Sequence, residues 1–156
     1  MRWLLNWRLE LQDLGRLLIA YALAVPIGWY REREAHSIGL RTFPLVAMAS
    51  CAYVLLGAPV GTMNYDDQSR IIQGLVAGIG FIGGGAILKA QGNVHGTATA
   101  ASIWNTGVLG ASVALGRYGL AITLAILNLV ALRILLPLKM KLDAAEGRET
   151  EPGEPK

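Results

Sequence analysis

Acidic residues and cysteine are both scarce in this sequence. No Asp or Glu occurs between Asp67 and Asp143, and the one cysteine is Cys51. A single cysteine excludes an internal disulfide, and its apolar surroundings favour a small core residue. Enzymes that work through a nucleophile need a base positioned beside it. The histidines, His36 and His95, lie in predicted loops away from Cys51, so we predict that the protein is not an enzyme.

Nucleotide-binding motifs are also missing, although the chain is rich in glycine. Gly78-x-Gly80-x-x-Gly83 matches the dinucleotide-binding pattern in its letters. That pattern requires a preceding strand and an acidic residue about 20 positions later, whereas here the flanks are apolar and no acid follows. The run that ends at Gly85 also lacks the Lys and Ser or Thr of a phosphate-binding loop. We therefore predict no nucleotide and no other cofactor.

Five apolar segments account for most of the 156 residues. Hydrophobic residues make up 53% of the chain, charged residues 16%, and the mean hydropathy is +0.43. A lipid core of about 30 Å is crossed by roughly 20 helical residues. We predict an all-α, polytopic membrane protein, a bundle of five transmembrane helices over residues 1–142, followed by a disordered polar cytoplasmic tail over 143–156. The predicted spans are Leu14–Tyr30, Leu40–Leu56, Ile71–Leu88, Ala98–Leu115 and Tyr118–Leu138.

The segment Ile71 to Gly110 holds ten of the 19 glycines. Glycine costs about 1 kcal/mol relative to alanine inside a helix, whereas small residues allow close helix packing in lipid. At about 100° per residue, the glycines of the third span fall on two opposite sides of the helix. We therefore predict a glycine-rich central helix, packed between two neighbours. The expected helix-packing residues are Gly74, Gly78, Gly80, Gly83, Gly84 and Gly85.

Lysine and arginine are distributed unequally between the two predicted sides of the membrane. One side receives eight: Arg31, Arg33, Arg41, Lys89, Lys139, Lys141, Arg148 and Lys156. The other receives four: Arg2, Arg8, Arg70 and Arg117. Positive residues favour the cytoplasm, so we predict the N-terminus outside and the C-terminus inside. The net charge of +3 is explained by this topology, and we predict no nucleic-acid partner.

Three segments carry a resemblance to a known family. They are Ile27-Gly28 to Arg31-Glu32 with Gly39-Leu40-Arg41-Thr42, then Asp67 to Arg70 continuing to Gly85, and finally Asn93-Val94, Gly96 and Thr99 to Trp104. In order and spacing, over residues 14 to 138, they resemble the MgtC/SapB family of bacterial inner-membrane proteins. The family usually has Glu where this chain has Tyr30, and Arg-Gly-Leu-Thr or Arg-Gly-Leu-Asn in place of residues 95–98. Longer members carry a C-terminal cytoplasmic domain, which this short form is expected to lack.

The resemblance implies a role in adaptation to low magnesium and in intracellular survival, a virulence-associated function. It also implies location in the bacterial inner membrane. Some members restrain the F-type ATP synthase, so we predict a non-enzymatic regulator that contacts such a complex through its helices. The faces of small residues on the predicted helices are also compatible with a homo-oligomer. The alternative is a transporter or channel for magnesium or another cation, although magnesium prefers carboxylate ligands and the predicted spans contain none.

We place the candidate functional site on the cytoplasmic face, where Arg31, Glu32 and Arg41 meet the polar break between the third and fourth spans. An equally weighted alternative is that these three residues form a structural ion-pair network. The residues of any metal site are unknown. The full candidate cluster is Arg31, Glu32, Arg41, Asp67, Arg70, Lys89, Asn93, His95, Thr99 and Asn105, with Thr99 and Asn105 as the polar candidates within the membrane.

Overall fold

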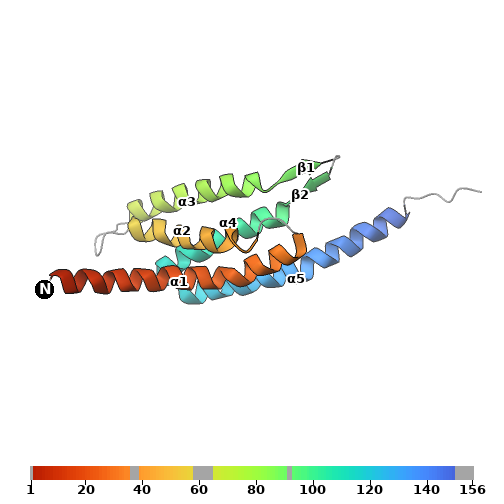
Figure 1. Ribbon diagram of the computed structural model, residues 1–156. Coiled ribbons are helices and arrows are strands. Elements are labelled where there is room, and N and C mark those ends of the chain that lie inside the picture. Colours follow the sequence, from red (N-terminus) through yellow and green to blue (C-terminus); the bar gives the residue numbers. More distant parts are fainter. Residues whose placement is uncertain (1, 36–38, 58–64, 91–92, 150–156) are drawn as a thin grey trace, which may run out of the picture.

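The fold consists of five helices and one short hairpin (Figure 1). A computed structural model describes residues 2–35, 39–57, 65–90 and 93–149. The elements are α1 (Arg2–Ala35), α2 (Thr42–Leu56), α3 (Tyr65–Gly85), β1 (Leu88–Ala90), β2 (Asn93–His95), α4 (Thr97–Ala114) and α5 (Tyr118–Glu149). Each predicted apolar segment forms most of one helix, so the all-α prediction is confirmed.

Successive helices run in opposite directions, which gives the bundle two distinct ends (Figure 1). The hairpin end contains the β1–β2 hairpin, the C-terminus of α1 and the N-termini of α2 and α4. The opposite end contains the start of α3 and the α4–α5 connection. Residues that lie far apart in the sequence therefore meet at the hairpin end.

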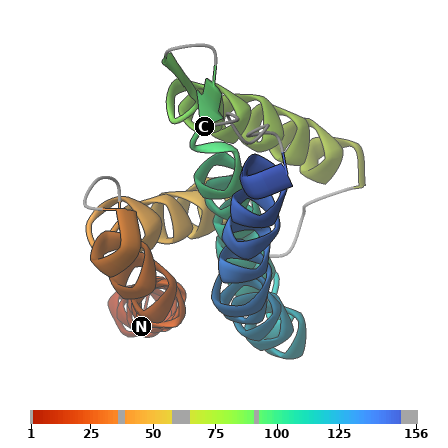
Figure 2. The ribbon, with the colours of Figure 1, turned by 90° about the vertical axis from the view of Figure 1, so that its right-hand side faces the viewer.

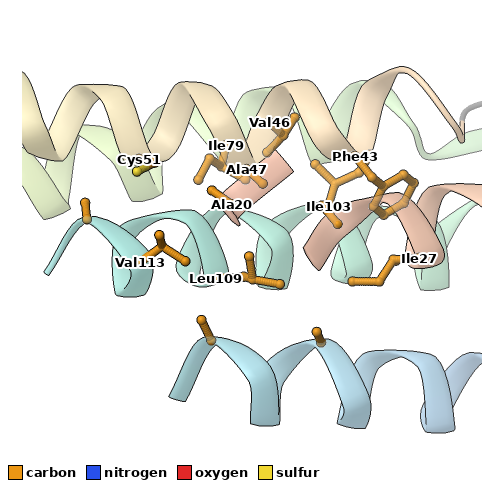
Figure 3. Packing of buried hydrophobic residues seen from close by; sticks show 14 of the residues in the cluster. Ala20, Ile27, Phe43, Val46, Ala47, Cys51, Ile79, Ile103, Leu109 and Val113 are labelled. Atoms are coloured by element: carbon orange, nitrogen blue, oxygen red, sulfur yellow. The ribbon is translucent and has the colours of Figure 1, made fainter. Parts of the chain in front are cut away.

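Helix α4 occupies the centre of the bundle and contacts each of the other four helices (Figure 2). Its buried side chains include Ile103, Leu109 and Val113, and side chains from α1, α2 and α3 converge on them (Figure 3). Two α4 glycines permit the close approach. A Cβ on Gly110 would lie 2.0 Å from the Ala47 carbonyl oxygen of α2, and one on Gly107 would lie 1.9 Å from an Ile79 side-chain carbon of α3.

The prediction that the glycine-rich helix is central is therefore wrong, because α3 lies at the edge of the bundle (Figure 2). Of its six glycines, Gly83 approaches a neighbour, with its Cβ position 3.3 Å from the Ala100 carbonyl oxygen. At the other five, a Cβ would meet nothing within 4 Å: Gly74, Gly78, Gly80, Gly84 and Gly85. The angular positions of the glycines show which sides of a helix lack side chains, but they do not show whether another helix of the same chain covers those sides.

The α1 and α5 helices both extend beyond the predicted spans. The N-terminal residues continue the first span, since α1 begins at Arg2. Helix α5 passes the predicted boundary at residue 142 and ends at Glu149, in a stretch rich in good helix formers such as Lys, Leu, Ala and Glu. The expected disorder of residues 143–149 is therefore not what the structure describes, and residues 150–156 lie outside the described part of the chain.

Membrane-crossing length is met by one of the described helical segments, Trp7–Arg33. Two further apolar segments, Thr42–Leu56 and Tyr118–Ile134, are shorter. By length and composition, five spans are thus not established. Helices α2 and α4, of 15 and 18 residues, measure roughly 22 and 27 Å at 1.5 Å per residue, slightly less than a typical lipid core.

Candidate functional site at the hairpin end

Arg31 is the buried charge at the hairpin end. It lies near the C-terminus of α1 with 6% of its surface exposed, and its Nη2 donates a hydrogen bond to Oγ1 of Thr99. Thr99 is buried in the first turn of α4. Burying a guanidinium is costly unless its N–H groups are hydrogen-bonded, so this bond fixes the end of α1 against the start of α4. The structure thus brings together two residues predicted for the site from segments 68 positions apart.

Glu32 closes the connection between α1 and α2. Its Oε2 accepts a 2.7 Å hydrogen bond from the backbone N–H of Leu40. The two chain segments approach closely here, since a Cβ on Gly28 would lie 2.8 Å from the Gly39 carbonyl oxygen. The described partner of Glu32 is a backbone amide rather than the side chain of Arg41, which is exposed just before α2. The functional and the structural interpretation of Glu32 both stay predictions.

Tyr30 joins α1 to α5 beside this site. Its hydroxyl donates to the Leu132 carbonyl oxygen at 3.5 Å, and the Arg133 guanidinium lies 5.9 Å from the ring centroid, within cation–π range. This chain therefore places an aromatic ring against Arg133 at the position where the resembling family usually has Glu. The sequence showed Tyr30 as a departure from the family pattern, but nothing in it indicated a partner in α5.

A second polar layer lies deeper in the bundle, between α4 and α5. Ser102 Oγ donates to Asn128 Oδ1 at 2.9 Å, and Asn128 Nδ2 donates to the Ser102 carbonyl oxygen at 3.4 Å. Asn105 Nδ2 donates to the Leu124 carbonyl oxygen at 3.4 Å. Asn105, a predicted site residue, thus bonds α5 rather than Arg31. Ser102 and Asn128 thus join α4 to α5 by two hydrogen bonds.

The hairpin forms where the sequence predicted a polar loop. Leu88 pairs with His95 and Lys89 with Val94 in an antiparallel register. Lys89 and His95 are exposed, as predicted for a cytoplasmic loop, and so are the apolar side chains of Leu88 and Val94, at 66% and 55%. The backbone of Asn93 belongs to β2, whereas its side chain lies outside the described part. The hairpin projects from the bundle (Figure 1).

Two predicted site residues lie elsewhere. Asp67 and Arg70 are exposed in the first turns of α3, at the opposite end from Arg31. Helix α3 begins at Tyr65, so Asp67 lies inside its first turn. Negative charge in the first turn is stabilised by the helix dipole, which accounts for Asp66 and Asp67 there.

A groove between α2 and α3 is the feature that sequence reasoning missed. It has a volume of about 790 Å³ and runs from Thr42 to Tyr53 along α2. Its α3 wall includes Gly74 and Gly78, with Arg70 at the opposite end of the bundle. The lining is mainly apolar. The described residues contain no group of three or more His, Cys, Asp or Glu arranged to hold a metal ion.

Comparison with known proteins identifies relatives along most of the chain. The model of the MgtC family matches residues 17–141. Protein SrpB of Synechococcus elongatus is 37% identical over 69% of this chain and 65% of its own length. "Putative magnesium transporter YhiD" of Escherichia coli K12 is 34% identical over 81% of this chain and 62% of its own length.

Protein MgtC of Salmonella typhimurium LT2 is 36% identical over 74% of this chain and 48% of its own length. The chain thus spans between about half and two thirds of these curated relatives. No solved structure matches it. The match of the family model to residues 17–141 shows that the chain belongs to the MgtC family.

Proposed function

We propose that this MgtC-family chain is a five-span inner-membrane protein of magnesium homeostasis, with its N-terminus outside and its C-terminus in the cytoplasm. Lipid contact is supported by the surface of the bundle. Large apolar side chains are exposed on several helices, including Leu18 of α1, Phe81 of α3 and Ile126 of α5. Only 22% of the most apolar window of Trp7–Arg33 is buried, whereas the core helix of a water-soluble protein would be mostly buried.

The alternation of helix direction supports the orientation. Arg31, Arg41 and Lys89 all lie at the hairpin end, and Arg70 and Arg117 lie at the opposite end. Basic residues gather on the cytoplasmic side of membrane proteins. The hairpin end is therefore the cytoplasmic end in this proposal.

The proposed action is non-enzymatic regulation of another membrane complex, with the F-type ATP synthase as the partner that the family resemblance implies. The observation that carries this proposal is the construction of the hairpin end. The hairpin presents Leu88 on one face beside His95 and Val94 on the other face beside Lys89, and it leads directly into α4, which Arg31 holds through Thr99. Exposed apolar side chains beside a charge, on a rigidly held support, suit contact with a protein surface.

Cation transport is the second candidate, and the name of the relative YhiD, a putative magnesium transporter, favours it. A path through the glycine-rich segment would require free backbone carbonyls. Residues Tyr65–Gly85 form a continuous helix, in which most carbonyls are used by the helical hydrogen bonds. The geometry therefore supports regulation better than transport.

The test compares two exposed leucines at opposite ends of the bundle, Leu88 of β1 and Leu56 of α2. Leu88→Ser is expected to abolish complementation of a deletion strain in low magnesium and to abolish copurification of the partner in mild detergent. Leu56→Ser should leave both intact at equal protein levels. Magnesium flux in liposomes that contain only the purified protein would refute regulation and establish transport instead.

A further inference from the structure

The outward face of α3 carries a regular series of exposed residues. Arg70, Gly74, Ala77, Phe81 and Gly84 follow one another at spacings of four, three, four and three. This spacing is the heptad pattern of a seam along which two helices pack side by side. Within the described chain, no helix lies against this seam, because a Cβ at Gly74 or Gly84 would meet nothing within 4 Å.

The outward face of α3 carries an apolar protrusion, the side chain of Phe81, and borders an apolar hollow, the α2–α3 groove. Phe81 is 85% exposed and is the most exposed large apolar side chain among the described residues. Gly78 lies beside the seam and forms part of the wall of the α2–α3 groove of about 790 Å³. On a helical projection, Phe81 and Gly78 flank the line through Gly74 on opposite sides. A two-fold axis along α3 would therefore place Phe81 of each copy against Gly78 and the groove of the other copy.

The charges at the start of α3 agree with this arrangement. All copies of a membrane protein insert in the same direction, so a two-fold axis along the membrane normal places equal residues at equal depth. Asp66, Asp67 and Arg70 are exposed within five residues of one another. Parallel pairing would thus place Arg70 of one copy about one helical turn, roughly 5 Å, from the depth of the acidic pair of the second copy, within reach of its long side chain, and opposite charges there attract.

We propose that α3 forms the interface of a symmetric, parallel homodimer, in which each Phe81 enters the groove of the other copy beside Gly78. Each glycine costs the helix about 1 kcal/mol relative to alanine, and contact with lipid chains does not offset this cost. A second helix does offset it, because small residues allow the two helices to pack closely. The seam, the protrusion with its matching groove and the charge pattern all occur on one surface, as an isologous contact requires. This inference rests on the membrane insertion proposed above.

The first experiment is disulfide crosslinking in native membranes, in a Cys51→Ala background. Gly74→Cys lies on the seam, and Val76→Cys lies on the same helix about 200° away, exposed but off the seam. A disulfide requires Cα atoms within about 7 Å. Gly74→Cys is expected to yield a crosslinked species of twice the monomer mass under oxidant, and Val76→Cys is expected to remain monomeric.

The second experiment tests the hollow with a matched pair. Gly78 lines the hollow and has no atom within 4 Å of its Cβ position, so a side chain there extends into open space within one copy. Gly78→Leu fills the hollow and is expected to lower the crosslinking of Gly74→Cys by about fivefold or more, whereas Val76→Leu, about 120° from the centre of the seam, should not change it.

The outcomes separate the possible occupants of the face. Equal crosslinking at positions 74 and 76, equal effects of the two leucine variants, or an adduct of another mass would each overturn the homodimer. Retention of the protein in the membrane after alkaline extraction is measured in parallel. A monomer that resists extraction refutes the dimer alone, and a protein released by alkali refutes the membrane proposal as well.

Discussion

Removing the hydroxyl of Thr99 tests whether the buried contact with Arg31 stabilises the bundle. Thr99→Val keeps the shape of the side chain and removes the acceptor of the Arg31 hydrogen bond. Hydrogen bonds to charged groups contribute about 1.5–3 kcal/mol, and both residues of this bond are buried away from water. We therefore expect the free energy of unfolding to fall by about 2 kcal/mol.

The assay is thermal unfolding of the purified protein in detergent or nanodiscs. For a chain of this size, 1 kcal/mol corresponds to a Tm change of about 2–4 °C, so Thr99→Val should lower Tm by about 4–8 °C. Thr99→Ser retains the hydroxyl and is the matched control. Its expected cost is that of one methyl group, about 0.8 kcal/mol.

A double-mutant cycle with Arg31→Met isolates the pairwise contribution. Once the guanidinium is gone, Thr99→Val should cost little more, which gives a coupling free energy of at least about 1 kcal/mol. Strictly additive effects, or equal losses in the Val and Ser variants, would show that the two residues are neighbours without energetic coupling. Our account of the hairpin end would then be wrong.

Three further predictions concern other contacts of the bundle. Gly110→Ala should destabilise the protein by about 1–3 kcal/mol, because its Cβ would lie 2.0 Å from the Ala47 carbonyl oxygen. Gly80→Ala should be neutral or stabilising by up to about 1 kcal/mol, because its Cβ would meet nothing within 4 Å. The Tm of each variant checks the two expectations. Ser102→Ala should cost about 0.6–2 kcal/mol by loss of the Asn128 contact, and equal stability of the variant would contradict an interhelical role. Glu32→Ala and Arg41→Ala should abolish growth complementation in low magnesium, and full complementation by both at normal protein levels would remove them from the site.

The sequence predicted the helices well, because apolar segments of this length have few alternatives. All five were found, with ends displaced where polar helix formers extend α1 and α5. It predicted their order in space poorly. Glycine in α3 and the Thr, Ser and Gly residues of α4 are equally small, and the choice of central helix depended on Gly107 and Gly110 meeting α2 and α3. That choice is a property of the assembled bundle.

The candidate site was predicted in part, for a physical reason. Arg31 and Glu32 were identified because charges at the end of an apolar segment need partners. Their actual partners, a Thr99 hydroxyl and the Leu40 backbone amide, could not be read from charge patterns, because neither carries a charge. The hairpin was missed since its strands have three residues each, too few for a periodic signal.

Gly96 is the single residue between β2 and the central helix α4, and it is tightly packed. It adopts a φ of 87°, and a Cβ there would lie 2.0 Å from the Ala86 carbonyl oxygen, so the start of α4 touches the backbone of the segment between α3 and β1. A force applied to the hairpin is thereby passed to the one helix that touches all the others. In the proposed orientation, a partner that binds the hairpin at the cytoplasmic end would therefore act on the entire bundle.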